Sequence, residues 1–324
     1  MATAVPVAAR RSSLRRTCHY AAVMLYDWSN CRFAGAMVPG YEDREISEDL
    51  AGRPLPPDDV FCFPLPESWR SRIWHMLEDI VTAEVKEEFI SNPPEYVVSD
   101  DLSWLDQIIY DVTGRVVDMK DVVADRFGKE YRAFRAGHAT RTNDVGQFYR
   151  HGLRYLRPDE IEERARGIFL NDQYPSAKEA RLQEAIADID ARKTAGGRAG
   201  WLYFAADERS LITRMGGSGH YLVYGSEYLY CLGIRTIGDR ETQNALKSIG
   251  RPTMFVCDIP MSMMRPHTLS EFGGMIIEYL FCELASLDCY TLSPGSGTAL
   301  SIAEDLPGEC IVGHYHPAGV YAPY

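Results

Sequence analysis

A histidine in a short apolar segment is the first residue of this chain whose surroundings could support chemistry. His138 lies within Arg135–Leu156, and a polar turn, Thr140–Asp144, follows it directly. A buried histidine beside such a turn is able to bind a sugar or an amide through hydrogen bonds. A lone histidine near a strand end is more often a hydrogen-bonded core residue, so both interpretations stay open for His138.

The same part of the chain is unusually basic. Between Lys129 and Arg157 there are seven Lys or Arg residues and two acids, whereas the whole chain has a net charge of −12. The overall negative charge argues against general attraction to nucleic acid or to anionic membranes. The local excess predicts either an anion-binding site or an ordinary solvated surface of helices and loops.

The composition is that of a globular protein with a sizeable core. The chain has 324 residues, of which 46% are hydrophobic and 25% charged, and no apolar run reaches the length of a membrane helix. Its eight cysteines form no C-x-x-C pair, which indicates reduced thiols and predicts a cytoplasmic location. The basic residues 1–17 are expected to be a disordered tail.

The pattern of predicted elements favours an α+β fold. Residues 18–125 are expected to form an N-terminal helical and irregular region, with amphipathic helices over 67–90 and 103–110. Residues 126–324 contain short predicted strands around His138, at 201–205, at 253–257 and at 309–312, separated by helices without regular strand–helix alternation.

Three separated segments of the second region form an ordered set of motifs. They are Gly137–Thr140 with Gly152–Arg154, then Tyr203-Phe204-Ala205, then Glu309–Val312. In this order they resemble the His-Tyr-Glu class of ADP-ribosyltransferases, which includes the poly(ADP-ribose) polymerases and diphtheria toxin. The resemblance covers about residues 130 to 324 and implies a split antiparallel β core with flanking helices in the region 126–324. Ala139 departs from the family pattern, which usually has Gly there.

The resemblance implies NAD as the substrate and assigns roles to individual residues. Cleavage of the nicotinamide–ribose bond passes through an oxocarbenium-like state, and Glu309 is the candidate carboxylate that stabilises it. His138 would hold the ribose, and Tyr203 would stack on the nicotinamide. The other expected NAD-binding residues are a second stacking ring (Tyr221 or Tyr224), a pyrophosphate ligand (Arg141 or Arg154), and Ala139, Thr140 and Asn143.

The implied activity is NAD-dependent transfer of ADP-ribose, by default a single unit, to a macromolecular acceptor that is a protein or a nucleic acid. A toxin or defence role is consistent with such an enzyme. The alternative from another class is a catalytically inactive module that binds NAD or ADP-ribose as a sensor. Incubation with labelled NAD separates transfer and cleavage from binding alone.

Two further features have alternative interpretations. Gly308–His316 spells G-x-x-x-x-x-H-x-H, the first half of a cupin metal motif, in which His314 and His316 would share a metal, but the Glu expected a few residues later is missing. The polar pair Ser226-Glu227 interrupts an apolar run. It predicts either a helix N-terminus or a second acidic group in the site.

Overall fold

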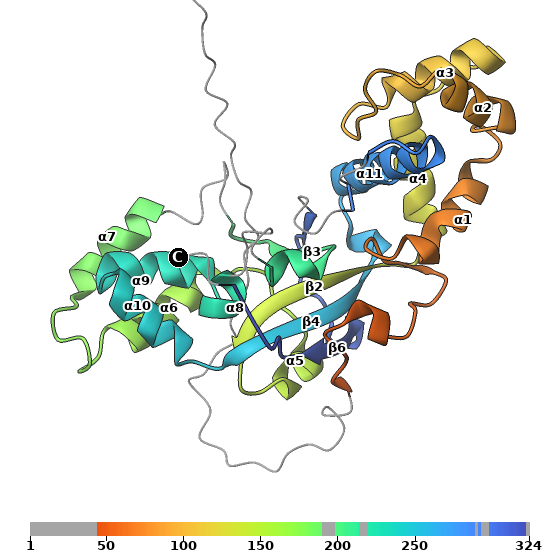
Figure 1. The fold of residues 1–324 in the computed structure, drawn as a ribbon. Helices are drawn as coiled ribbons and strands as arrows, with labels where there is room; N and C mark the ends of the chain where they lie inside the picture. Colours follow the sequence, from red (N-terminus) through yellow and green to blue (C-terminus); the bar gives the residue numbers. More distant parts are fainter. Residues whose placement is uncertain (1–43, 190–197, 214–219, 289–290, 293–297, 322–324) are drawn as a thin grey trace, which may run out of the picture.

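The chain is described by a computed structural model that covers residues 44–189, 198–213, 220–288, 291–292 and 298–321 (Figure 1). The predicted disordered tail, residues 1–17, lies outside the described residues. Among the described helices, none combines the length and the apolar character that crossing a membrane requires.

A sheet with strand order β5-β3-β2-β4-β6 forms the centre of the molecule, and all neighbours along this order are antiparallel. The two long strands, β2 and β4, pair with each other over ten residues, and the short strand β1 pairs with β2 in parallel. The strands are β1 (Val60–Phe61), β2 (Ala133–Thr142), β3 (Leu202–Ala205), β4 (Arg251–Pro260), β5 (Ala299–Ile302) and β6 (Ile311–Tyr315). This arrangement confirms the predicted α+β class.

Four helices precede the long strands: α1 (Pro66–Leu77), α2 (Ala83–Ser91), α3 (Ser103–Thr113) and α4 (Met119–Glu130). The single helix predicted over 67–90 is wrong, because the chain turns between α1 and α2. Thr82 caps the new helix, since its side chain accepts a hydrogen bond from the backbone N–H of Val85. The predicted start of α3 is supported by Asp101, whose carboxylate accepts from the N–H of Ser103 at 2.9 Å.

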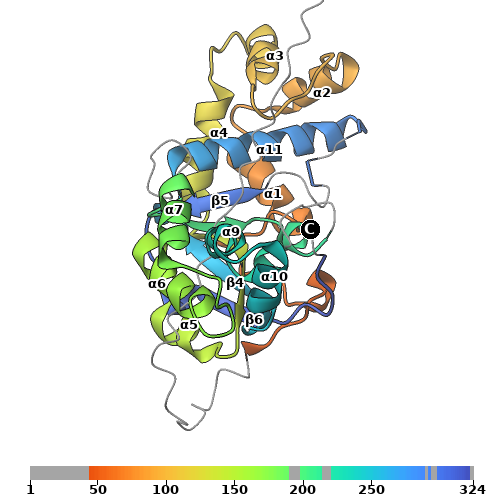
Figure 2. The same cartoon turned by 90° about the vertical axis from the view of Figure 1, so that its left-hand side faces the viewer.

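The N-terminal helices share one hydrophobic core with the sheet and with the long helix α11 (Pro266–Leu284). Phe272 of α11 lies between two aromatic rings, with centroid distances of 5.3 Å to Phe63 and 4.8 Å to Phe134. Figure 2 shows α11 lying between the sheet and the pair α2 and α3. The boundary expected between residues 125 and 126 falls inside α4, which packs against α11.

A second group of helices lies at the opposite end of the sheet from α1–α4 (Figure 1). These helices form their own apolar core, in which Phe169, Leu182 and Leu229 are buried. They are α6 (Pro158–Phe169), α7 (Glu179–Ile189), α8 (His220–Tyr224), α9 (Glu227–Thr236) and α10 (Asp239–Lys247), and a short α5 (Gly146–His151) precedes them. Most residues predicted to bind NAD lie on the sheet or on α8, whereas Asn143 and Arg154 lie in the connections after β2 and α5.

Candidate functional site

The two faces of the sheet separate the predicted catalytic residues. Gly137 of β2 pairs with Ala205 of β3, and side chains alternate between faces along each strand. Tyr203 therefore lies on the face of Ala139, where both pack with the same apolar cluster. His138 points to the other face and packs against Phe204, with ring centroids 5.5 Å apart.

His138 is a core residue in the structure. The residue is 1% exposed, and its Nδ1 lies 3.0 Å from the carbonyl oxygen of Tyr203. Nδ1 must carry the proton in this hydrogen bond, and Nε2 has no partner among the described residues. Burial lowers the pKa of His138 to about 4, so the ring is neutral at pH 7. This geometry agrees with the hydrogen-bonded core interpretation, and the role at the ribose stays a prediction.

Glu309 lies elsewhere on the sheet. It belongs to the short helix η6 (Gly308–Cys310) at the start of β6, and its side chain is exposed. Strands β2 and β4 separate β6 from the strand that carries Tyr203. The structure does not bring Glu309 together with His138 and Tyr203, so its catalytic role stays a prediction that the geometry does not support.

Arg141 is occupied by the protein itself. The residue is 8% exposed. Its guanidinium donates to four backbone carbonyls, those of Leu222, Lys247, Ile249 and Gly250. These bonds tie α8 and the turn before β4 to β2. Since all of its donors point into the fold, Arg141 is a structural residue and is not placed to bind a pyrophosphate.

The other expected NAD-binding residues are also dispersed. Arg154 forms an ion pair with Glu160 at 3.1 Å, and Asn143 is exposed in the bend after β2. Ala139 and Thr140 are fully buried in β2. Tyr221 and Tyr224 are at most 1% exposed, so neither ring presents a free face for a nicotinamide. The expected second stacking ring is therefore not formed by either tyrosine.

The basic segment is neutralised by acids, some from distant parts of the chain and some only a few residues away. Arg135 pairs with Asp258 at 2.7 Å, and Arg157 pairs with Asp305 at the same distance. The further pairs are Lys129 with Asp125, Arg132 with Asp59, and Arg150 with Asp144. This pattern agrees with the surface interpretation of the segment and not with an anion site.

A different set of polar residues converges beside Tyr203, and we name it the Glu227 cluster: Arg198, Tyr203, His220, Tyr221 and Glu227. The hydroxyl of Tyr221 donates to Oε2 of Glu227 at 3.0 Å, and Arg198 forms an ion pair with the same oxygen. His220 Nε2 lies 3.7 Å from it. The Glu227 side chain is 21% exposed, so the carboxylate is held from several sides and still reaches solvent.

The local sequence explains why Glu227 has this position. Gly225 adopts a φ of 81°, which lets the chain turn sharply between α8 and α9. Ser226 then caps α9, because its side chain accepts a hydrogen bond from the N–H of Leu229. Glu227 follows in the first turn of α9, where the helix dipole favours a negative charge. The helix N-terminus predicted at the Ser226-Glu227 pair is therefore confirmed, and a role of Glu227 as a second acidic group in the site stays a prediction.

Electrostatics keep the Glu227 carboxylate ionised. Burial by itself would raise its pKa, but the interactions with His220 and Arg198 outweigh burial and lower that pKa to about 2. Burial raises the pKa of the neighbouring Tyr203. Sequence reasoning missed Arg198 and His220; the only available signals were the Gly-rich break before Arg198 and the adjacency of His220 to Tyr221.

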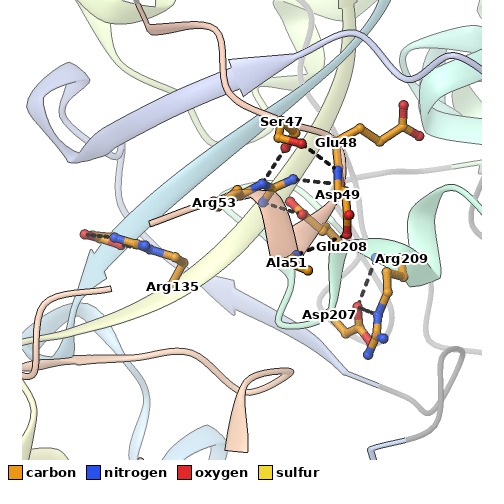
Figure 3. Close-up of polar contacts among 10 residues, drawn as sticks. Ser47, Glu48, Asp49, Ala51, Arg53, Arg135, Asp207, Glu208 and Arg209 are labelled. Carbon is orange, nitrogen blue, oxygen red and sulfur yellow. Dashed lines mark hydrogen bonds and ion pairs between the residues drawn. The ribbon is translucent and has the colours of Figure 1, made fainter. Parts of the chain in front are cut away.

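A second buried carboxylate, that of Glu208, lies on the face of the sheet to which Gly137 and Tyr203 belong, and Figure 3 shows it beside Arg53. Glu208 follows β3 and forms an ion pair with Arg53 of the N-terminal segment at 2.5 Å. Gly137 permits this approach, since a Cβ there would lie 2.7 Å from the Cβ of Glu208. The Arg53 guanidinium also stacks on Tyr315 at 4.9 Å. Burial raises the pKa of Glu208 to about 7.

The two histidines of the cupin-like motif have protein partners. His314 Nδ1 lies 2.7 Å from the hydroxyl of Tyr149, and His316 Nδ1 lies 3.0 Å from the carbonyl oxygen of Pro252. Within the described ranges, no group of three or more His, Cys, Asp or Glu side chains is placed to hold a metal.

Comparison of the chain with protein-family models, with curated proteins and with solved structures gives no match. Its chemistry must therefore be inferred from its own residues. A fixed carboxylate beside an arginine and a half-buried aromatic ring is suited to a cationic, aromatic substrate that also carries negative groups.

Proposed function

We propose that this chain is an NAD-dependent ADP-ribosyltransferase that cleaves the nicotinamide–ribose bond and transfers ADP-ribose to a protein or nucleic-acid acceptor. The observation that carries the proposal is the Glu227 cluster, in which an ionised, partly exposed carboxylate is close enough to Tyr203 to act on its phenol electrostatically. The ordered motifs around His138 and Tyr203 support it, and the α+β sheet is compatible with it. A split core of the ADP-ribosyltransferase kind is part of the proposal.

The proposed reaction needs a negative charge beside the ribose of NAD. As the bond breaks, the positively charged pyridinium takes the bonding electrons and leaves as neutral nicotinamide, while positive charge develops on the ribose. A carboxylate that is already fixed stabilises this charge without reorganising in the transition state. Tyr221 and Arg198 fix the Glu227 carboxylate in this way. The acceptor's nucleophile then bonds to the ribose carbon and releases its proton to solvent.

The aromatic groups of the cluster have separate roles in this proposal. Tyr203 is only partly buried and would stack on the nicotinamide ring. Tyr221 is fully buried and its hydroxyl donates to Glu227, so it is a positioning residue. His138 supports the carbonyl of Tyr203 from the opposite face of the sheet and thereby fixes the strand that carries the stacking ring.

The function is tested by incubating the full chain with NAD labelled in the adenosine part, with cell extract as a source of acceptors. The readouts are free nicotinamide and labelled macromolecules. We expect Glu227→Gln to reduce both by about 10²- to 10³-fold, while Glu309→Gln stays near the wild type. The reverse result would support the motif-based assignment to Glu309 and overturn the role of Glu227. Absence of nicotinamide release and of transfer by the wild type would reject the enzyme.

One observation favours a second candidate function, the inactive NAD or ADP-ribose sensor. The structure separates His138, Tyr203 and Glu309, which the resemblance would require together in an active enzyme. Saturable NAD binding in calorimetry without nicotinamide release would support this alternative. The single-unit transfer, the toxin or defence role and the cytoplasmic location stay predictions.

A further inference from the structure

Arg265 is an arginine beside the Glu227 cluster that the proposed catalytic step does not use. It lies directly before α11, and its guanidinium stacks on the ring of Trp201 at 4.6 Å. Its Nη2 donates to the hydroxyl of Ser301 at 3.1 Å. Within the described residues Arg265 forms no ion pair, although the residue is exposed, so its charge is not cancelled by a carboxylate of that part of the chain.

The partners of Arg265 connect it to Tyr203. Ser301 of β5 pairs with Tyr203 of β3 in the sheet register. Trp201 lies two residues before Tyr203 and directly precedes β3. The charge of Arg265 also acts on the phenol, since it opposes the rise that burial causes in the pKa of Tyr203.

The arrangement around Arg265 has the properties of a phosphate site. Stacking on an indole ring and a hydrogen bond to a neutral hydroxyl hold a guanidinium in one orientation while leaving other N–H donors available. A planar guanidinium binds phosphate oxygens through two parallel hydrogen bonds. The arginines expected to do so from sequence are unsuitable, because Arg141 donates to backbone carbonyls and Arg154 pairs with Glu160.

We infer that Arg265, held by Trp201 and Ser301, binds the diphosphate of NAD while the nicotinamide lies at Tyr203 and Glu227. This inference rests on the proposed function and names the group that recognises the phosphate half of the substrate. A ligand that reaches both Tyr203 and Arg265 must carry an aromatic ring, then a spacer, then a phosphate group. NAD has this order of groups.

The test compares ligands with and without phosphates. Calorimetry would measure binding of NAD, ADP-ribose and nicotinamide riboside to the wild type and to Arg265→Gln. We expect the substitution to weaken NAD and ADP-ribose by about 10- to 100-fold and to leave nicotinamide riboside unchanged. Ser301→Ala should weaken the same two ligands by a few-fold, because it only orients the guanidinium.

A matched control is Arg235→Gln, another exposed helix arginine, which pairs with Asp188 at 2.9 Å. It should change no affinity, and thermal unfolding should show that all three variants fold. Three results would overturn the inference. Arg265→Gln could weaken nicotinamide riboside and NAD equally, it could leave ADP-ribose binding unchanged, or the wild type could fail to bind ADP-ribose. Phosphate-dependent binding that requires Arg265 but yields no nicotinamide would preserve the subsite and reject the transferase.

Discussion

Glu208 and Glu227 are two largely buried glutamates on the same side of the sheet, and their environments shift their pKa values in opposite directions. Burial raises the pKa of Glu208 to about 7, whereas the pKa of Glu227 falls to about 2 although burial acts on it too. Glu208 pairs with Arg53 and is weakly stabilised by the charge of Arg209, while its neighbour Asp207 adds a repelling charge. Glu227 has Arg198, the Tyr221 hydroxyl and a helix N-terminus.

The difference shows that the donors around a carboxylate, and not its burial alone, determine its charge in this fold. Glu208 is arranged for holding the N-terminal segment against the sheet, because Arg53 also donates to the carbonyls of Ser47 and Glu48 (Figure 3). Glu227 is arranged for keeping a negative charge at a position that solvent reaches. The comparison therefore separates a structural ion pair from a candidate catalytic one.

The largest expected effect is on catalysis. Glu227→Gln should lower nicotinamide release at pH 7.5 by about 10²- to 10³-fold, because the transition-state charge loses its fixed counter-charge. Glu208→Gln should stay within about threefold of the wild type, since it changes the other carboxylate. Initial rates with NAD in excess would measure both. Comparable losses in the two variants would abolish the distinction drawn between these residues.

The next effect is on stability. Arg53→Met leaves the Glu208 carboxylate buried without its cation, and we expect it to lower the free energy of unfolding by about 3–5 kcal/mol at pH 8. At pH 5 the loss should be smaller, because the Glu208 carboxyl is then protonated. Urea unfolding at the two pH values would measure this. The double variant Arg53→Met/Glu208→Gln should recover most of the loss, and an equal loss at both pH values would show that Arg53 acts through packing.

A third prediction concerns the pH dependence of the wild type. Because the folded pKa of Glu208 is raised above its ordinary value of 4.5, its contribution to stability is fully present below about pH 4.5 and is lost as the pH rises through 7. The stability of the wild type relative to Glu208→Gln should fall by about 3 kcal/mol between pH 4.5 and pH 8. Urea titrations of both proteins give the difference. A flat difference would place the folded pKa of Glu208 near its ordinary value.

The smallest effect tests a single donor to Glu227. Tyr221→Phe removes the hydroxyl that lies 3.0 Å from Oε2 and should raise the pKa of Glu227. Nicotinamide release should fall by about tenfold. The acid limb of the pH–rate profile should move to higher pH, because in the wild type it follows the low pKa of the Glu227 carboxylate. An unchanged profile together with a reduced rate would assign Tyr221 to packing alone.

Two strands of the second region were predicted well because their signals are local, whereas the strand predicted at 309–312 was wrong at Glu309 and Cys310, which belong to η6. The strand predicted at 253–257 lies within β4, and the one at 201–205 nearly coincides with β3. The Ser226-Glu227 pair likewise indicated the start of α9. The break between α1 and α2 was missed, because an apolar periodicity continues across a turn that only the cap at Thr82 reveals.

The candidate site was predictable only in part. Tyr203 was identified from its motif and Tyr221 as one of two candidate stacking rings; both belong to the Glu227 cluster, although Tyr221 is buried and does not stack. The sequence could not reveal that the motifs lie apart. The strand order β5-β3-β2-β4-β6 places Glu309 on the far side of β4 from Tyr203. Two of the acids that neutralise the basic segment, Asp258 opposite Arg135 and Asp305 opposite Arg157, lie more than one hundred positions away in the chain.

The sequence by itself determined the α+β class and the short-range features, because caps, alternation and helical periodicity depend on residues a few positions apart. Only the tertiary structure decided which side chains meet. The pairing of Gly137 with Ala205 put His138 and Tyr203 on opposite faces, and the packing of α8 and α9 beside β3 brought Glu227 to the tyrosine. Strand register and order depend on contacts between distant segments, and a one-residue difference in register exchanges the two faces of a strand.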